Sequence, residues 1–172
     1  KIDTNVDLPS SYATYYAHWK ANEITFNWDS ACGTPDTQTT KQTFGTGNII
    51  LPTQPTKTGY DFVGWFDGET QITGNTPIPA TTPNNYTARW NAKVIPVTFD
   101  AGQGATASVP AQVWLKYADG YYTDQACTSQ KITALTTKPS KAGFTFTGFF
   151  DSTTGSTKYV NADGAFDSTN MS

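Results

Sequence analysis

An internal repeat is the feature that most constrains how this chain can fold. Residues 55–67, PTKTGYDFVGWFD, recur as residues 139–151, PSKAGFTFTGFFD, without a gap, so the offset is 84 throughout (139 minus 55). The Pro, the Lys, both Gly, the second aromatic and the final Asp hold the same places in both copies. Repetition on this scale predicts consecutive structural units rather than one continuous domain.

A second repeated pair sets the order of segments within each unit. Residues 15–21, YYAHWKA, match residues 86–92, YTARWNA, at an offset of 71 (86 minus 15), and each copy is soon followed by a strand-like run, at 24–28 and 97–99. The opening runs lie 73 residues apart and the middle segments 84. The second unit is therefore predicted to carry an insertion of about eleven residues, which we expect between Trp114 and Thr137.

These offsets divide the chain into three parts. Residues 1–21 are predicted to be the closing strand of a preceding repeat. Residues 22–92 form a complete repeat, and residues 93–172 form a longer, divergent repeat without an obvious closing segment. An unpaired strand edge invites pairing between chains, so a strand-exchanged dimer is a further expectation.

The composition and the alternation of side chains both favour strands. Thr is abundant, aromatic residues make up 14% of the chain, and Gly, Pro, Asn and Asp supply turn formers. In the closing segment, Tyr86, Ala88 and Trp90 share one face, as expected for a strand buried on one side. Gly64 and Gly148 interrupt the middle strands at equivalent points and predict a bulge. The only helical expectation is one short turn within residues 129–135, so the predicted class is mostly β with a minor α+β component.

These motifs resemble the Listeria–Bacteroides repeat family. Residues 22–92 carry its opening strand at 24–26, its Pro-x-Lys-x-Gly-aromatic segment at 55–65 and its Tyr-x-Ala-x-Trp closing segment at 86–90. Residues 93–172 carry the first two, with Phe149 in place of a Trp. The resemblance implies tandem small β-grasp-like units, in which a small sheet wraps a short helical or turn element. It also implies a bacterial parent protein that is secreted or attached to the cell wall.

Charge and hydropathy exclude two classes of partner. The net charge is −3 with a pI near 4.9, and no Lys/Arg cluster could neutralise a run of phosphates, so we expect no nucleic acid. No apolar stretch approaches the ~20 residues of a transmembrane helix. The sequence begins at Lys1 without a leader, which we interpret as a piece of a longer extracellular, cell-surface or cell-wall protein.

The sequence offers little for catalysis or metal binding. His18 is the single histidine, and it is predicted to be a solvated strand residue rather than a catalytic base. With Cys32 and Cys127 it cannot make a zinc site of the usual type, and whether these two cysteines form a disulfide stays open.

The acidic residues likewise give little indication of catalysis or metal binding. A glycosidase pair among Asp61, Asp67 and Glu69 stays open in principle, but Asp61 aligns with Thr145 in the second copy and Asp67 is predicted to start a turn. Residues 119–124 lack the spacing of a calcium loop. We therefore expect no catalytic residue, no metal and no cofactor.

The aromatic side chains are compatible with two alternative functions. Trp19, Trp65 and Trp90 stand at motif positions and are predicted to fill the cores. Four aromatic residues that do not recur are the candidates for a ligand-facing surface: Trp28, Trp114, Tyr121 and Tyr122. The main prediction is a non-catalytic spacer or stalk that can also engage a host or bacterial surface protein, and the alternative is a carbohydrate-binding adhesin module.

Overall fold

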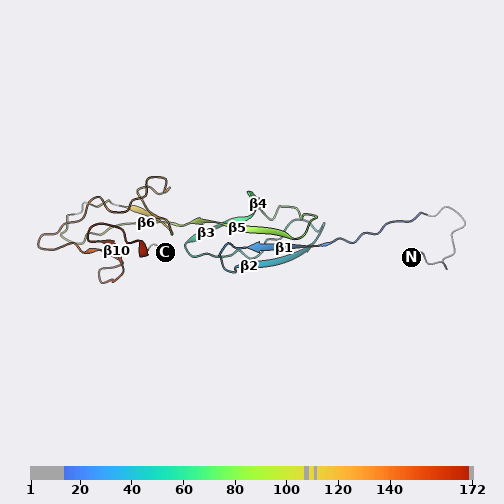
Figure 1. Cartoon of the computed structure of the whole chain (residues 1–172), viewed down its shortest axis with the longest axis horizontal. Coiled ribbons are helices and arrows are strands. Elements are labelled where there is room, and N and C mark those ends of the chain that lie inside the picture. The colour runs from blue at the N-terminus through green and yellow to red at the C-terminus, as the bar shows by residue number, and fades with distance from the viewer. Residues whose placement is uncertain (1–13, 107–108, 111, 171–172) are drawn as a thin grey trace.

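The structure, a computed structural model, describes residues 14–106, 109–110 and 112–170. Two β-rich units follow one another along the long axis of the molecule (Figure 1). The first unit comprises residues 23–92 and the second unit residues 93–170. The strands of the first are β1 (Glu23–Asp29), β2 (Thr37–Thr43), β3 (Tyr60–Asp67), β4 (Thr70–Ile72) and β5 (Asn84–Ala92). Those of the second are β6 (Val94–Val97), β7 (Val113–Lys116), β8 (Gly120–Tyr122), β9 (Gly148–Phe150) and β10 (Lys158–Asn161), followed by the 3₁₀ helix η1 (Ser168–Asn170).

The first unit is one five-stranded mixed sheet. Its order is β2-β1-β5-β3-β4, with β5 in the centre. β5 runs parallel to β1 and antiparallel to β3, and the outer strands pair antiparallel. The closing segment of the repeat is therefore the central strand of the sheet, with a partner on each edge.

The predicted alternation is confirmed in this sheet. In β1 the residues Ile24, Phe26 and Trp28 are at most 1% exposed, and in β5 Tyr86 and Ala88 are 5% and 4% exposed. These side chains form the core cluster, which is drawn entirely from the first unit: Ile24, Phe26, Trp28, Ile49, Trp65, Ile72, Ile78, Tyr86 and Ala88. The first unit thus has a core of its own.

The bulge predicted at the mid-strand glycine is present. The pairing of β3 with β5 shifts register between Phe62 and Gly64. Gly64 has a φ of 154° and its copy Gly148 a φ of 134°, a region that residues with a Cβ rarely adopt. The extra residue bends β3 over the core, so Trp65 beyond the bulge is buried.

The second unit repeats part of this plan in two smaller sheets. β6, β7 and β8 form one sheet, and β9 pairs with β10 in the other. Phe149 of β9 faces Val160 of β10 as Trp65 of β3 faces Ile72 of β4. β9 and β10 therefore correspond to β3 and β4, and Val160 is fully buried like its counterpart.

The insertion lies in the predicted region. Twenty-two residues lie between the end of β7 and Pro139, against eleven between the end of β2 and Pro55, a difference of eleven. The extra residues include β8, which pairs with β7 as a hairpin that has no counterpart in the first unit.

The helical turn expected within residues 129–135 is wrong. Ile132 and Ala134 instead make isolated β-bridges to Tyr121 and Ala165. These bridges pair the stretch with neighbouring extended backbone, so its apolar side chains can be buried without forming a helix. Leu135 is 6% exposed.

The closing strand predicted at the start of the chain is not a strand here. Residues 14–22 form no ladder and extend away from β1 (Figure 1), while residues 1–13 of the predicted element lie outside the described residues. Tyr15, Tyr16 and Trp19 are 84%, 80% and 92% exposed. The same pattern is buried in β5 because β1 and β3 flank it, and no strand flanks residues 14–22.

The mostly-β, tandem-repeat class is confirmed. In the first unit the irregular segment between β2 and β3 contributes Ile49 to the core and buries Pro55. The finer β-grasp assignment stays a prediction. Among the described residues no helix is long and apolar enough to cross a bilayer.

Candidate functional site

Three of the four aromatic candidates for ligand contact are buried, which corrects the expectation that they face solvent. Trp28 is 1% exposed, Tyr121 2% and Tyr122 7%. The Trp28 ring packs against Trp65 and Tyr86 with centroids 5.3 and 4.9 Å apart. Trp28 therefore belongs to the core, although it does not recur in the second repeat and was for that reason predicted to face a ligand. A side chain enclosed in this way cannot stack on a sugar ring.

The polar ends of the buried aromatics are occupied as well. Trp28 Nε1 donates a hydrogen bond to Thr40 Oγ1 at 2.9 Å, and the Tyr122 hydroxyl donates to Asp119 Oδ2 at 2.9 Å. Tyr121 stacks on Phe166 with centroids 4.0 Å apart. Trp114, on β7, is half-buried and is the one candidate that keeps part of its surface.

Asp119 is one of two carboxylates in the second unit, with Asp124, whose pKa is held well below its usual range. Besides Tyr122 it accepts hydrogen bonds from Lys131, and Lys116 Nζ lies 3.1 Å away. Lys131, then Tyr122 and Lys116, hold the pKa of Asp119 well below its usual range. This network fastens the β7–β8 hairpin to the loop after it, so its role in the geometry is structural.

The remaining polar candidates do not converge on one point. His18 is exposed in the segment before β1. Glu69 pairs with Arg89 at 2.7 Å on the outside of the first sheet, and Asp61 lies 3.8 Å from Lys93. Within the described residues no group of three or more His, Cys, Asp or Glu side chains could hold a metal ion.

Both cysteines are free in the structure. Cys32 is exposed and Cys127 is partly buried, one in each unit. Asp124, in the stretch considered for calcium, accepts hydrogen bonds from the amides of Thr128 and Ser129 at 3.1 and 2.8 Å. Its carboxylate closes a turn of its own backbone.

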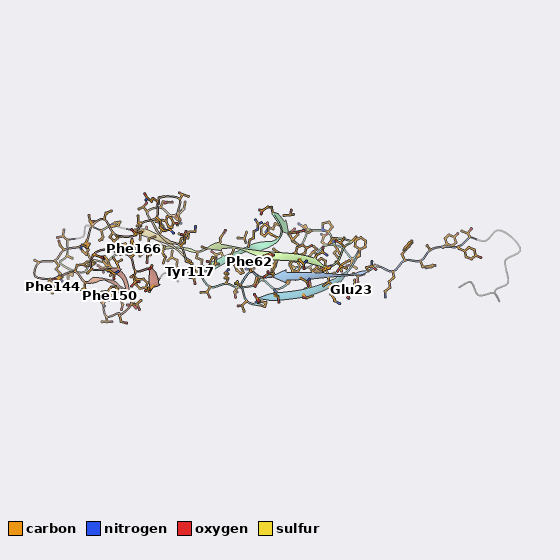
Figure 2. All side chains as sticks on the ribbon, in the orientation of Figure 1. Glu23, Phe62, Tyr117, Phe144, Phe150 and Phe166 are labelled. Atoms are coloured by element: carbon orange, nitrogen blue, oxygen red, sulfur yellow. The ribbon has the colours of Figure 1, made fainter. Side chains whose placement is uncertain are left out.

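The junction between the units is built from backbone as well as side chains. β5 ends at Ala92 and β6 begins at Val94, and the residue between them, Lys93, donates its amide to Gly59 and accepts from the amide of Tyr117 (both 2.9 Å). The Tyr60 and Tyr117 rings meet edge to face at 5.3 Å. Figure 2 shows Tyr117 between the two units. One nearly continuous strand thus crosses from the first sheet into the sheet of β6.

Exposed aromatic side chains are present at both ends of the molecule. One end is the segment before β1, with Tyr15, Tyr16 and Trp19. The other end holds Phe144, 71% exposed, beside a cavity of about 180 Å³ lined by residues 139–141 and 144–148 with Ala101 and Ala105. The labelled Glu23 and Phe144 lie toward opposite ends of the long axis (Figure 2).

Sequence reasoning missed both the cavity and the junction. No signal pointed to Tyr117, which lies outside every repeated motif.

Comparison with known proteins agrees with the repeats seen in both sequence and structure. The model of the Listeria-Bacteroides repeat domain matches residues 23–88 and again residues 96–171. The chain belongs to this family. It is also similar to Internalin H of Listeria monocytogenes serovar 1/2a, with 33% identity over 141 residues. That match covers 79% of this chain but 22% of Internalin H, so the chain spans about a fifth of that relative. No solved structure matches.

Proposed function

We propose that this chain is a non-catalytic spacer region of a bacterial surface protein. The observation that carries the proposal is the junction, where β5 and β6 continue through Lys93 and Tyr117 closes against Tyr60. Two small units joined by a flexible linker would be free to fold back on each other. Hydrogen-bonded backbone across the junction instead holds them end to end, which is what a spacer requires.

Family membership and the likeness to an internalin support an extracellular, cell-surface location for the parent protein. The low charge and the Thr-rich outer faces of the strands suit an exposed position. In the first sheet, for example, Asn27 on β1 donates to Asn85 on β5 at 3.0 Å and accepts from Thr39 at 3.4 Å. This outward face is polar and self-satisfied, so it supports a scaffold more than a ligand site.

The experiment is a distance measurement between spin labels in the two units. Labels at exposed Thr70 and Thr136, placed by cysteine substitution after Cys32→Ser and Cys127→Ser, report the relative position of the units. A rigid spacer gives one narrow distance distribution. A broad distribution reaching short distances contradicts the proposal.

The carbohydrate-binding alternative loses most of its residues in the fold, because Trp28, Tyr121 and Tyr122 are buried. We expect the whole chain to give no signal on a broad glycan array. Glycan binding that is lost on substitution of the half-buried candidate, Trp114→Ala, would instead support the carbohydrate-binding adhesin function.

A further inference from the structure

The junction between the two units consists of a few contacts with a defined donor and acceptor side. On the side of the second unit, Lys93 precedes β6 and Tyr117 follows its partner strand β7, and the amide of Tyr117 donates to the carbonyl of Lys93 at 2.9 Å. On the side of the first unit, Gly59 accepts a hydrogen bond from the amide of Lys93 at 2.9 Å. The Tyr60 ring meets the Tyr117 ring at 5.3 Å. A Cβ on Gly59 would come within 2.3 Å of the Tyr117 ring, so this ring lies directly on the glycine.

The first unit carries the second-unit side of this junction at its own opposite end. Asn22 precedes β1 and Phe44 follows its partner strand β2, and the amide of Phe44 donates to the carbonyl of Asn22 at 2.9 Å. This bond closes the β1–β2 ladder as the bond from Tyr117 closes the β6–β7 ladder. Glu23, next to Asn22, and Tyr117 lie at opposite ends of the first unit (Figure 2). Phe44 is 43% exposed. We call Asn22 and Phe44 the β1 docking face.

The element that Tyr117 covers is a turn that both units form from the same motif. Gly59 in the first unit has a φ of 77°, and its copy Gly143 has a φ of 79°. A lysine lies over the aromatic residue that follows the glycine, Lys57 at 4.8 Å in the first unit and Lys141 at 4.7 Å in the second. The Pro-x-Lys-x-Gly-aromatic motif therefore specifies this turn locally, and any further unit with the motif presents the same surface.

We propose that the β1 docking face binds the Gly-aromatic turn of a further repeat unit of the same family, placed before β1 as the first unit is placed before β6. The amide of Asn22 donates to the carbonyl of the turn glycine. The Phe44 ring covers that glycine and packs on the aromatic residue after it. The inference rests on the proposed spacer function and deepens it, because it makes one kind of joint recur from unit to unit.

The chemistry of Phe44 suits this partner. Phe44 differs from Tyr117 only in lacking a hydroxyl, and the contacts of Tyr117 across the junction are made by its ring. An aromatic ring gains by burying its face on backbone and by meeting a second ring edge to face. Residues 15–21, which lead to Asn22, also have the pattern of β5, which leads to Lys93. The order of segments at the docking face is therefore that of the junction.

The test places a second copy of the first unit before the docking face. Replacing residues 1–21 of the chain by residues 1–92 puts a complete unit directly before Asn22, with Ala92 of the inserted copy in the place of Ala21. With the cysteines changed to Ser, spin labels at Thr70 of the inserted and of the original copy report the distance between them. We expect one narrow distribution, broadened by Phe44→Ser in the original copy and kept narrow by Phe44→Tyr, which installs the residue type of the junction.

The matched control is Ile50→Ser in the original copy, because Ile50 is a 71% exposed apolar side chain away from the end of the β1–β2 ladder. It should leave the distribution narrow. From the other side of the contact, Tyr60→Ser in the inserted copy should broaden the distribution as Phe44→Ser does. The two substitutions together should have little more effect than either alone, since they remove the same contact.

Amide hydrogen exchange gives a second readout that does not depend on the labels. The Asn22 amide should exchange roughly tenfold more slowly in the three-unit chain than in the chain without the insert, because it gains a hydrogen bond to Gly59 of the inserted copy. A broad distribution in the unsubstituted three-unit chain, a narrow one that Phe44→Ser does not broaden, or an unchanged Asn22 amide overturns the proposal.

The labels at Thr70 and Thr136 of the chain without the insert keep the two proposals apart. If their distance distribution is narrow while the three-unit chain fails the test, the docking face is wrong and the spacer function stands. If both distributions are broad, the spacer function fails as well.

Discussion

At the scale of single residues, burial in this protein depends on what lies beside a side chain more than on what the side chain is. Trp28 and Trp19 are both on strand-like runs with alternating apolar residues, yet one is 1% and the other 92% exposed. Trp28 has Trp65 and Tyr86 around it. Trp19 has no flanking strand.

This contrast predicts very different costs for the same change. Trp28→Ala removes a fully enclosed ring and leaves a cavity, so it should lower the free energy of unfolding of the first unit by about 3–5 kcal/mol. Trp19→Ala should change it by less than about 0.5 kcal/mol. Urea unfolding followed by far-UV circular dichroism, at concentrations where the chain is monomeric, measures both. Similar losses for the two variants would mean that Trp28 is not in the core.

Asp119 carries a second residue-scale prediction. Its pKa is depressed by Lys131, Tyr122 and Lys116, so its contribution to stability is present above the ordinary carboxyl pKa of about 4 and is lost as the pH falls below it. The second unit should therefore become less stable between pH 5 and acid, and Asp119→Asn should lower its stability at pH 7 and flatten this acid response, with about 4 as the upper limit of the affected window. Thermal unfolding at a series of pH values tests this, with Asp61→Asn in the first unit as the control. An unchanged acid response in Asp119→Asn would contradict the assignment.

At the scale of elements, the two copies of the middle strand, β3 and β9, share a sequence pattern but differ in the strands that pair with them. β3 pairs with β4 on one edge and β5 on the other, while β9 has β10 as its one partner strand among the residues that the structure describes. The turns that lead into them are alike: Tyr60 donates its amide to Lys57 at 3.1 Å, and Phe144 to Lys141 at 3.0 Å. The local sequence thus specifies the turn and the bulge. The number of strands that pair with the middle strand depends on other segments of the chain.

The glycine at the start of β9 supplies the prediction at this scale. A Cβ on Gly148 would come within 2.3 Å of the carbonyl oxygen of Val160, whereas a Cβ on Gly143 would meet nothing within 4 Å. Both have positive φ, so Gly143→Ala should cost only the conformational strain, about 1 kcal/mol. Gly148→Ala should in addition break the β9–β10 ladder, seen as faster amide hydrogen exchange in β9 and β10. Equal exchange in the two variants would show that the contact is relieved without loss of pairing.

At the scale of the whole molecule, the junction decides whether two small units behave as one body. Its contacts are few but directional: the two amide hydrogen bonds through Lys93 and the edge-to-face pair of Tyr60 and Tyr117. The Tyr117 ring also packs directly on Gly59, since a Cβ there would come within 2.3 Å of the ring. Removing Tyr117 therefore loosens the joint without entering either core.

Tyr117→Ser should broaden the spin-label distance distribution between Thr70 and Thr136. Each unit should keep its own unfolding transition, because the substituted ring lies between the cores. Ile50→Ser, which removes a 71% exposed apolar side chain of the first unit away from the joint, is the control and should leave the distribution narrow. If Tyr117→Ser also leaves it narrow, the backbone hydrogen bonds alone hold the units in line.

The sequence by itself determined that the chain holds two repeats, and with them the strand periodicity, the glycine bulge of β3 and the site of the eleven-residue insertion. Each of these depends on local spacing, and local spacing is written in the order of residues. The tertiary structure alone decided that Trp28, Tyr121 and Tyr122 are buried, that residues 14–22 are exposed, and that a cavity lies beside Phe144 in the second unit. Alternation shows which side chains share a face of a strand. Whether that face is covered depends on neighbours brought together from distant parts of the chain.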